Sequence, residues 1–220
     1  MKTKPNLSAF MDLIFPPRCV LCGAVIRSAD KVCQACAQEI EHIHAKKCIY
    51  VPGAGQTILC TVPYVYDGKV RESIIRFKFY GQTGSADFFG GQIAGELLEN
   101  ASEFDFITAV PISVPRRRLR GYNQSELIAR AASKRLGLPY RESLVKTTDN
   151  KEQHKLSEKE RRKNVCGAYR LVSKDEIYGK HILLVDDIVT TGATLCECAE
   201  VLFQGGAKSV SCAAIAEVEL

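Results

Sequence analysis

The segment ILLVDDIVTTGATL (182–195) constrains the fold of this chain more than any other. Its first four residues are apolar, which is typical of a strand buried on both faces of a parallel sheet. Two carboxylates follow, then a threonine-rich turn ending at Gly192, then a helical pattern to about Phe203. Ligands of open α/β sheets bind at the carboxyl ends of the strands. The segment therefore predicts an α/β protein with a ligand site directly after this strand.

Other segments alternate in the way that such a sheet requires. FITAV (106–110) and SLVK (143–146) read as strands around a helix at 124–136, and 209–215 reads as a last buried strand. Two further helices are expected at 70–79 and 87–98. Strands that alternate with helices indicate a parallel sheet with crossover helices.

The turn after the carboxylates has the chemistry of a phosphate site. A turn that opens a helix presents unpaired backbone N–H groups and the positive end of the helix dipole. Gly192 allows close approach, and Thr190, Thr191 and Thr194 add hydroxyl donors. The carboxylates of Asp186 and Asp187 can accept hydrogen bonds from the vicinal hydroxyls of a sugar. The alternative is that the acidic pair caps a helix and the turn is ordinary.

Cysteines are concentrated at the N-terminus, where six of the ten lie within the first 60 residues. Two CxxC pairs separated by ten residues can form a tetrahedral zinc site with four thiolate ligands: Cys19, Cys22, Cys33 and Cys36. Free thiols are the alternative. Cys48 begins no further CxxC pair, because Val51 follows it three residues later, so no second complete site is expected. We predict a zinc module over 1–60, structural in role, and a second domain over 61–220.

Charge and hydropathy limit the partners and the location. A formal charge of +5 favours anionic ligands without separating small phosphates from nucleic acid. The N-terminus lacks the apolar core of a signal peptide, and no apolar run reaches the ~18 residues of a membrane span. We therefore expect a cytoplasmic protein with no membrane span.

VDDIVTTGATL (185–195) resembles the motif with which type I phosphoribosyltransferases bind phosphoribosyl pyrophosphate (PRPP). The resemblance implies the type I phosphoribosyltransferase fold, with Asp186 and Asp187 on the ribose hydroxyls. It also implies that the 5′-phosphate lies in a loop made of Ile188, Val189, Thr190, Thr191, Gly192, Ala193 and Thr194. Purine-type members carry an aspartate where this chain has Thr190, which argues against salvage of hypoxanthine or guanine.

Three more segments, at 66–81, 116–130 and 146–169, make the chain similar to the ComF family of competence-associated, phosphoribosyltransferase-like proteins. RGYNQ (120–124) is the most specific block. The resemblance implies a link to DNA uptake and natural transformation, and to nucleotide metabolism. Two functions remain open. The chain is either a phosphoribosyltransferase that uses PRPP and Mg²⁺, or a non-catalytic module that keeps the PRPP pocket and binds single-stranded DNA and a helicase-like competence ATPase.

Basic residues after the 106–110 strand are candidates for both functions. Arg116 and Arg118 are predicted to neutralise the pyrophosphate leaving group, while a solvated charge run is the alternative. The predicted nucleic-acid residues come from this segment and from the charged stretch at 147–164, which is expected to form a mobile active-site loop: Arg117, Arg120, Tyr122, Arg161, Arg162 and Lys163. Asn123 and Gln124 are read either as a helix cap with a surface neighbour or as ligand contacts. Lys78 and Arg71 are expected on a solvated helix face.

Overall fold

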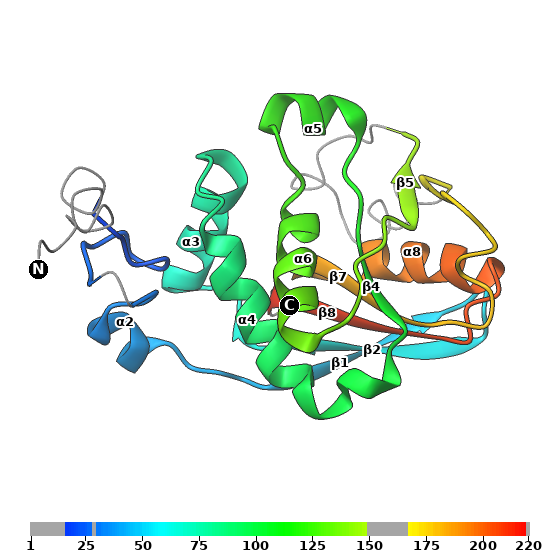
Figure 1. Cartoon of the computed structure of the whole chain (residues 1–220), viewed down its shortest axis with the longest axis horizontal. Helices are drawn as coiled ribbons and strands as arrows, with labels where there is room; N and C mark the ends of the chain where they lie inside the picture. Colours follow the sequence, from blue (N-terminus) through cyan, green and yellow to red (C-terminus); the bar gives the residue numbers. More distant parts are fainter. Residues whose placement is uncertain (1–15, 28–29, 149–166, 219–220) are drawn as a thin grey trace, which may run out of the picture.

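A six-stranded sheet forms the centre of the computed structural model, which describes residues 16–27, 30–148 and 167–218 (Figure 1). Its strand order is β1-β2-β8-β7-β4, and β3 (Tyr64–Val65) pairs with β8. The strands are β1 (Ala45–Val51), β2 (Gln56–Val62), β4 (Phe106–Ala109), β7 (His181–Val189) and β8 (Ser209–Glu217). All neighbours pair in parallel except β1 and β2, which form an antiparallel hairpin. The predicted parallel sheet is thus confirmed.

Residues 143–146 do not join this sheet, so that part of the prediction is wrong. β5 (Leu144–Lys146) pairs antiparallel with β6 (Tyr169–Leu171) in a separate two-stranded sheet. The outer edge of β4 is already paired, because Ile107 donates to Pro139 O and accepts from Arg141 N, both at 2.9 Å. With that edge satisfied, the chain turns away before β5 begins.

Helices cover both faces of the sheet (Figure 1). One face packs against α3 (Gly68–Phe79), α4 (Ser85–Leu97) and α6 (Gln124–Leu136), and the other packs against α8 (Ala193–Gln204). Along β7, Leu183 and Val185 enter the first core and Ile182 and Leu184 the second, as expected for a strand buried on both faces. This is the predicted three-layer α/β architecture.

α6 begins and ends where the sequence predicts. Asn123 caps it by accepting a hydrogen bond from Ser125 N at 3.2 Å, and Gly137 ends it in the left-handed conformation (φ 68°). The helix packs closely against α4, because a Cβ on Gly90 would lie 2.5 Å from the Ala131 methyl group. Glycine at position 90 allows the two helices to approach, and this fixes the start of α6 near the edge of the sheet.

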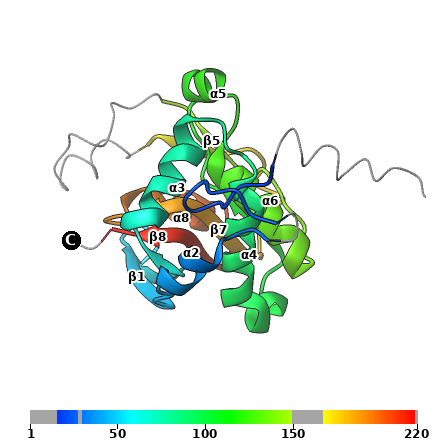
Figure 2. The ribbon, with the colours of Figure 1, turned by 90° about the vertical axis from the view of Figure 1, so that its left-hand side faces the viewer.

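The N-terminal module docks on α3. Its short helix α2 (Gln34–Glu39) lies with α3 at the end of the molecule that faces the viewer in Figure 2. Lys69 on α3 forms an ion pair with Glu39, and Ser73 Oγ donates to Val20 O at 2.7 Å. β1 and most of β2 also precede residue 61, and both belong to the main sheet. The first 60 residues therefore contribute to the core as well as to the zinc module.

Two shorter helices complete the described chain. The 3-10 helix η1 (Leu98–Glu103) leads into β4, and α5 (Val114–Arg120) follows that strand and projects beyond the sheet (Figure 1). The basic residues after β4 therefore lie on a helix. None of the described helices combines the length and the apolar character that a bilayer span requires.

Candidate functional site

Two adjacent carboxylates lie near the carboxyl end of β7. Ser125 Oγ and the backbone N–H of Asp187 both donate to Asp186 Oδ1, each at 2.8 Å. Asp187 is buried, and its Oδ2 lies 2.9 Å from Lys78 Nζ. β7 continues to Val189, so Ile188 and Val189 belong to the strand and not to the turn. The loop expected from 188 to 194 is reduced to the turn at 190–192.

Burial and repulsion from Asp187 raise the pKa of Asp186 to about 7, although Ser125, the Asp187 amide and Lys78 oppose the shift. Near neutral pH the pair therefore holds a proton part of the time. A ligand that donates hydroxyl groups to both carboxylates favours their ionised forms. The carboxylate pair therefore suits a ligand that donates hydrogen bonds rather than an anion.

Lys78 does not lie on a solvated face, so that prediction is wrong. Its side chain is only 19% exposed and forms the ion pair with Asp187. Lys78 lies beside the buried Phe77 on α3, and only the fold shows that Asp187 comes next to it. Lys78 is therefore a site residue that the sequence analysis missed.

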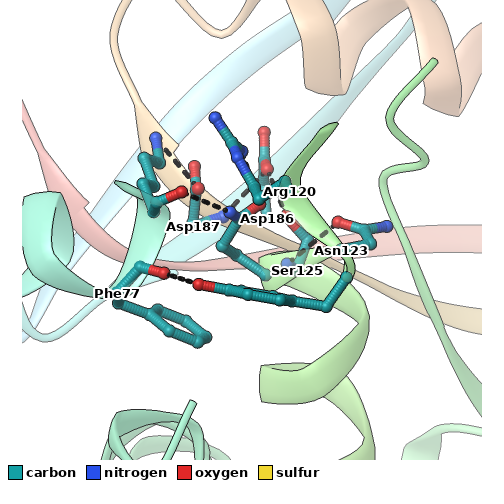
Figure 3. A network of polar contacts seen from close by, with 9 residues as sticks. Phe77, Arg120, Asn123, Ser125, Asp186 and Asp187 are labelled. Atoms are coloured by element: carbon teal, nitrogen blue, oxygen red, sulfur yellow. Dashed lines mark hydrogen bonds and ion pairs between the residues drawn. The ribbon is translucent and has the colours of Figure 1, made fainter. Parts of the chain in front are cut away.

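The RGYNQS segment (120–125) connects the site to three elements (Figure 3). Asn123 Nδ2 donates to Val110 O at 2.9 Å, and the Tyr122 hydroxyl donates to Phe77 O. Gln124 is fully buried, which excludes the reading of this residue as a surface neighbour of the helix cap. Its Oε1 accepts from Arg120 at 2.7 Å, and its Nε2 donates to Lys78 O. These contacts place Ser125 against Asp186.

The turn at 190–192 leads directly into α8. Gly192 has a φ of 79°, and a Cβ there would lie 2.9 Å from the Ile49 side chain on β1. The first backbone hydrogen bond of α8 runs from Cys196 N to Gly192 O. The amides of residues 193–195 come before this bond, so they have no carbonyl partner within the helix. Thr191 Oγ1 accepts weakly from Ala193 N at 3.4 Å. Thr190, Thr191, Ala193 and Thr194 are half-buried around this helix start.

α5 carries arginines to the same edge of the sheet. Val110 N donates to Val185 O, and this bond places the residues that follow β4 beside Asp186. Arg117 is paired with Glu126 at 3.1 Å and with Glu142 at 3.5 Å. Arg116 is half-buried, and Arg118 is exposed.

Arg120 and Tyr122 connect α5 and the start of α6 to α3. Arg120 lies beside the carboxylates (Figure 3) and over the Phe79 ring at 5.1 Å. The Tyr122 ring stacks on Phe77, with centroids 5.9 Å apart. The predicted residues Arg161, Arg162 and Lys163 lie outside the described residues.

The predicted zinc ligands come together. One sulfur atom from each of Cys19, Cys22, Cys33 and Cys36 lies within 4.8 Å of the others. Cys22 Sγ and Cys33 Sγ are 3.7 Å apart, close to the ~3.8 Å expected for two thiolates on one tetrahedral zinc ion. Burial opposes ionisation, but backbone amides of Cys33, Cys22 and Leu21 lower the pKa of Cys19 to about 6. The cluster therefore fits a structural zinc ion with no open coordination position.

Other cysteines lie apart from this cluster. Cys198 and Cys212 are buried in the core, and burial raises the pKa of both thiols. Cys196 is half-buried and donates to Tyr50 O at 3.4 Å. Cys166 lies outside the described residues.

Two domain models match the chain. A double zinc ribbon domain matches residues 10–52, and a phosphoribosyl transferase domain matches residues 123–219. Together with the parallel sheet and the cysteine cluster, they define the class: a phosphoribosyltransferase fold that carries an N-terminal zinc ribbon.

Three relatives narrow this class. The chain is 29% identical to the DNA utilization protein YhgH of Escherichia coli O157:H7, over 87% of this chain and 86% of the relative. It is 31% identical to the competence protein ComFC of Bacillus subtilis, over 67% of this chain and 60% of the relative. It is also 38% identical to the competence protein F of Haemophilus influenzae, over 47% and 46%. The chain belongs to the ComF family.

Proposed function

We propose that this protein binds PRPP at the edge of the sheet formed by Asp186, Asp187 and the turn at 190–192. One observation carries the proposal: a carboxylate pair, in which Asp186 is half-buried and Asp187 buried, is followed by a glycine turn that opens a helix. The pair accepts hydroxyl donors, and the helix start accepts a phosphate. A ribose that carries a 5′-phosphate offers both of these groups.

The diphosphate of PRPP would lie toward α5. Arg116 and Arg118 would neutralise it there, and Mg²⁺ would arrive bound to its oxygens. If the site transfers the phosphoribosyl group, the nitrogen of an amine or base forms the bond to ribose C1. The bond from C1 to pyrophosphate breaks, and the acceptor releases its proton. The role of the arginines is to stabilise the departing charge.

Lys78 would hold the Asp187 carboxylate in place for the ribose. Lys78 Nζ lies 2.9 Å from Asp187 Oδ2, and both side chains are largely shielded from water. Ribose hydroxyls can then donate to the carboxylate oxygens. Lys78 is a positioning residue in this proposal, because it acts on the substrate through Asp187.

Calorimetric titration with PRPP and Mg²⁺ tests the proposal. Asp187→Asn should weaken binding by roughly 5- to 150-fold, since an acceptor of a hydroxyl hydrogen bond is worth about 1–3 kcal/mol. Asp105→Asn is the matched control, because Asp105 also contacts a lysine, Lys180 at 3.2 Å, but at the amino end of the strands. Equal affinities for the two variants would contradict the proposed site.

A second candidate function is binding of single-stranded DNA, which the names of the relatives suggest. The observation that favours it is an exposed aromatic and basic surface beside the site. Phe79 is 61% exposed and Tyr80 is 73% exposed at the end of α3, where Arg120 lies over the Phe79 ring. Bases can stack on such aromatic rings while arginines follow the phosphates. The Tyr122 ring already stacks on Phe77, so we place base stacking at Phe79 and Tyr80.

Fluorescence anisotropy with labelled single-stranded DNA tests this candidate. Tyr80→Ala combined with Arg118→Ala should weaken binding, and the affinity of the wild type should fall steeply with salt. Lys208→Ala is the control, because Lys208 is exposed near the amino end of β7. Displacement of the DNA by PRPP would indicate shared residues. A helicase-like partner stays a prediction.

A further inference from the structure

The segment between the four-cysteine cluster and β1 carries two histidines that face α4. His42 and His44 flank Ile43, whose N–H donates to Pro63 O at 2.9 Å. The two imidazoles stack with centroids 5.5 Å apart. Glu96 on α4 reaches them, with Oε1 2.6 Å from His44 Nδ1. One ligand atom from each of the three residues lies within 4.8 Å of the others.

Hydrogen bonds fix the His42 ring in a form that can bind a metal. The Tyr64 hydroxyl donates to Gln92 Oε1 at 2.9 Å, so its proton is already used. Its oxygen lies 3.2 Å from His42 Nε2 and must therefore accept from that nitrogen. This leaves the Nδ1 lone pair of His42 available. Imidazoles that bind metals almost always donate their other N–H to such a partner.

The backbone at His44 gives a second, independent indication. His44 is the one non-glycine residue with a positive φ, 46°, among the described residues. This conformation costs about 1–2 kcal/mol in a residue with a side chain. Residues with a strained backbone are common at ligand-binding and switch sites, where other interactions compensate for the strain. The contact between His44 Nδ1 and Glu96 Oε1 does not by itself explain this strain.

We propose that His42, His44 and Glu96 form a second metal site, separate from the four-cysteine cluster, that binds Zn²⁺ through two imidazoles and one carboxylate. Imidazole ligands suit zinc and related transition metals rather than Mg²⁺ or Ca²⁺. Zinc ligands lie ~3.3 Å apart in a tetrahedral site, so the side chains need only small movements. Three protein ligands leave one coordination position open to water.

The metal would brace the link between the zinc ribbon and the sheet. His42 and His44 precede β1, while Glu96 lies in the last turn of α4. The ion would therefore fix the chain that joins the two parts. The open position also makes this site easier to strip with a chelator than the closed thiolate site.

Zinc content of the full-length, untagged chain, measured by elemental analysis after equilibration with Zn²⁺ and gel filtration, tests the proposal. We expect two zinc ions per chain in the wild type and one in His44→Ala and in Glu96→Gln. Glu99→Gln is the matched control, an exposed carboxylate three residues further on, and it should keep two. Cys22→Ser combined with Cys33→Ser should lose the other ion and keep this one.

Two further measurements keep the result clear. Cobalt substitution separates the sites, because only the cysteine cluster gives a thiolate charge-transfer band, and that band should be unchanged in Glu96→Gln. Tyr64→Phe removes the partner of His42 and should weaken zinc binding at this site by about 10- to 100-fold. One zinc ion in the wild type, or two in folded His44→Ala and Glu96→Gln, would overturn the proposal.

Discussion

Lys78 Nζ on α3 lies 2.9 Å from Asp187 Oδ2 on β7. The same helix contacts the zinc ribbon, since Ser73 Oγ donates to Val20 O and Arg76 Nη2 donates to Leu21 O. α3 therefore contacts the zinc ribbon through Ser73 and Arg76 and the carboxylate pair through Lys78. Substitutions that remove the contact with the zinc ribbon and substitutions that remove the contact with Asp187 can be tested separately.

Lys78→Met should weaken PRPP binding more at pH 7 than at pH 9. Loss of the ammonium group raises the pKa of Asp186 further, because Lys78 is one of the groups that lower it. Affinities measured by calorimetry at the two pH values check this. Lys180→Met, which removes the partner of Asp105, should leave both values unchanged. A pH-independent loss of affinity would show that Lys78 acts in another way.

Asp186→Asn should flatten the dependence of stability on pH. The pKa of Asp186 is raised in the folded protein. Between about pH 4 and 7 the folded protein therefore keeps a proton on Asp186 that the unfolded chain has already released. Stability therefore falls as the pH rises through this window, by at most about 1.4 kcal/mol per unit for one proton. Above pH 7 the variant should be more stable than the wild type while it loses PRPP affinity. Urea unfolding at several pH values measures the difference, and equal slopes would contradict the assignment.

Gly192→Ala should lose PRPP affinity and stability. An alanine there must adopt a φ of 79°, and its Cβ would meet Ile49 at 2.9 Å. Gly179→Ala separates the two effects, because Gly179 has a φ of 71° and no atom within 4 Å of an added Cβ. We expect a loss of about 1–2 kcal/mol for Gly179→Ala and a larger one for Gly192→Ala. Thermal melts and PRPP titration of both variants check this, and equal losses would exclude the contact with Ile49.

Loss of the zinc ligands Cys19 and Cys36 should unfold the ribbon and spare the sheet. The ribbon has its own small apolar cluster, while the two main clusters lie on the faces of the sheet. Cys19→Ser combined with Cys36→Ser should therefore leave one cooperative transition in scanning calorimetry. Complete loss of that transition would show that the sheet depends on the metal.

Sequence patterns predicted the elements whose limits are set by residues close to one another in the chain. Asn123 and Gly137 bound α6, and the buried run of β7 places the acidic pair. Long-range contacts could not be predicted in the same way. Lys78 reads as solvated until β7 brings Asp187 beside it, and residues 144–146 read as a sheet strand until Pro139 and Arg141 pair with β4. The contact between Glu96 and His44 spans 52 residues and has no local signal.

The central claim is that Asp186 and Asp187 hold the ribose while α5 faces the diphosphate. Calorimetric titration of the wild type and of Asp186→Asn combined with Asp187→Asn, with PRPP, ribose 5-phosphate and pyrophosphate in turn, tests it most directly. We predict that the folded double variant loses affinity for both ribose ligands, by roughly 5- to 150-fold for each carboxylate removed, and binds pyrophosphate as the wild type does. Unchanged PRPP affinity in the folded double variant would contradict the account.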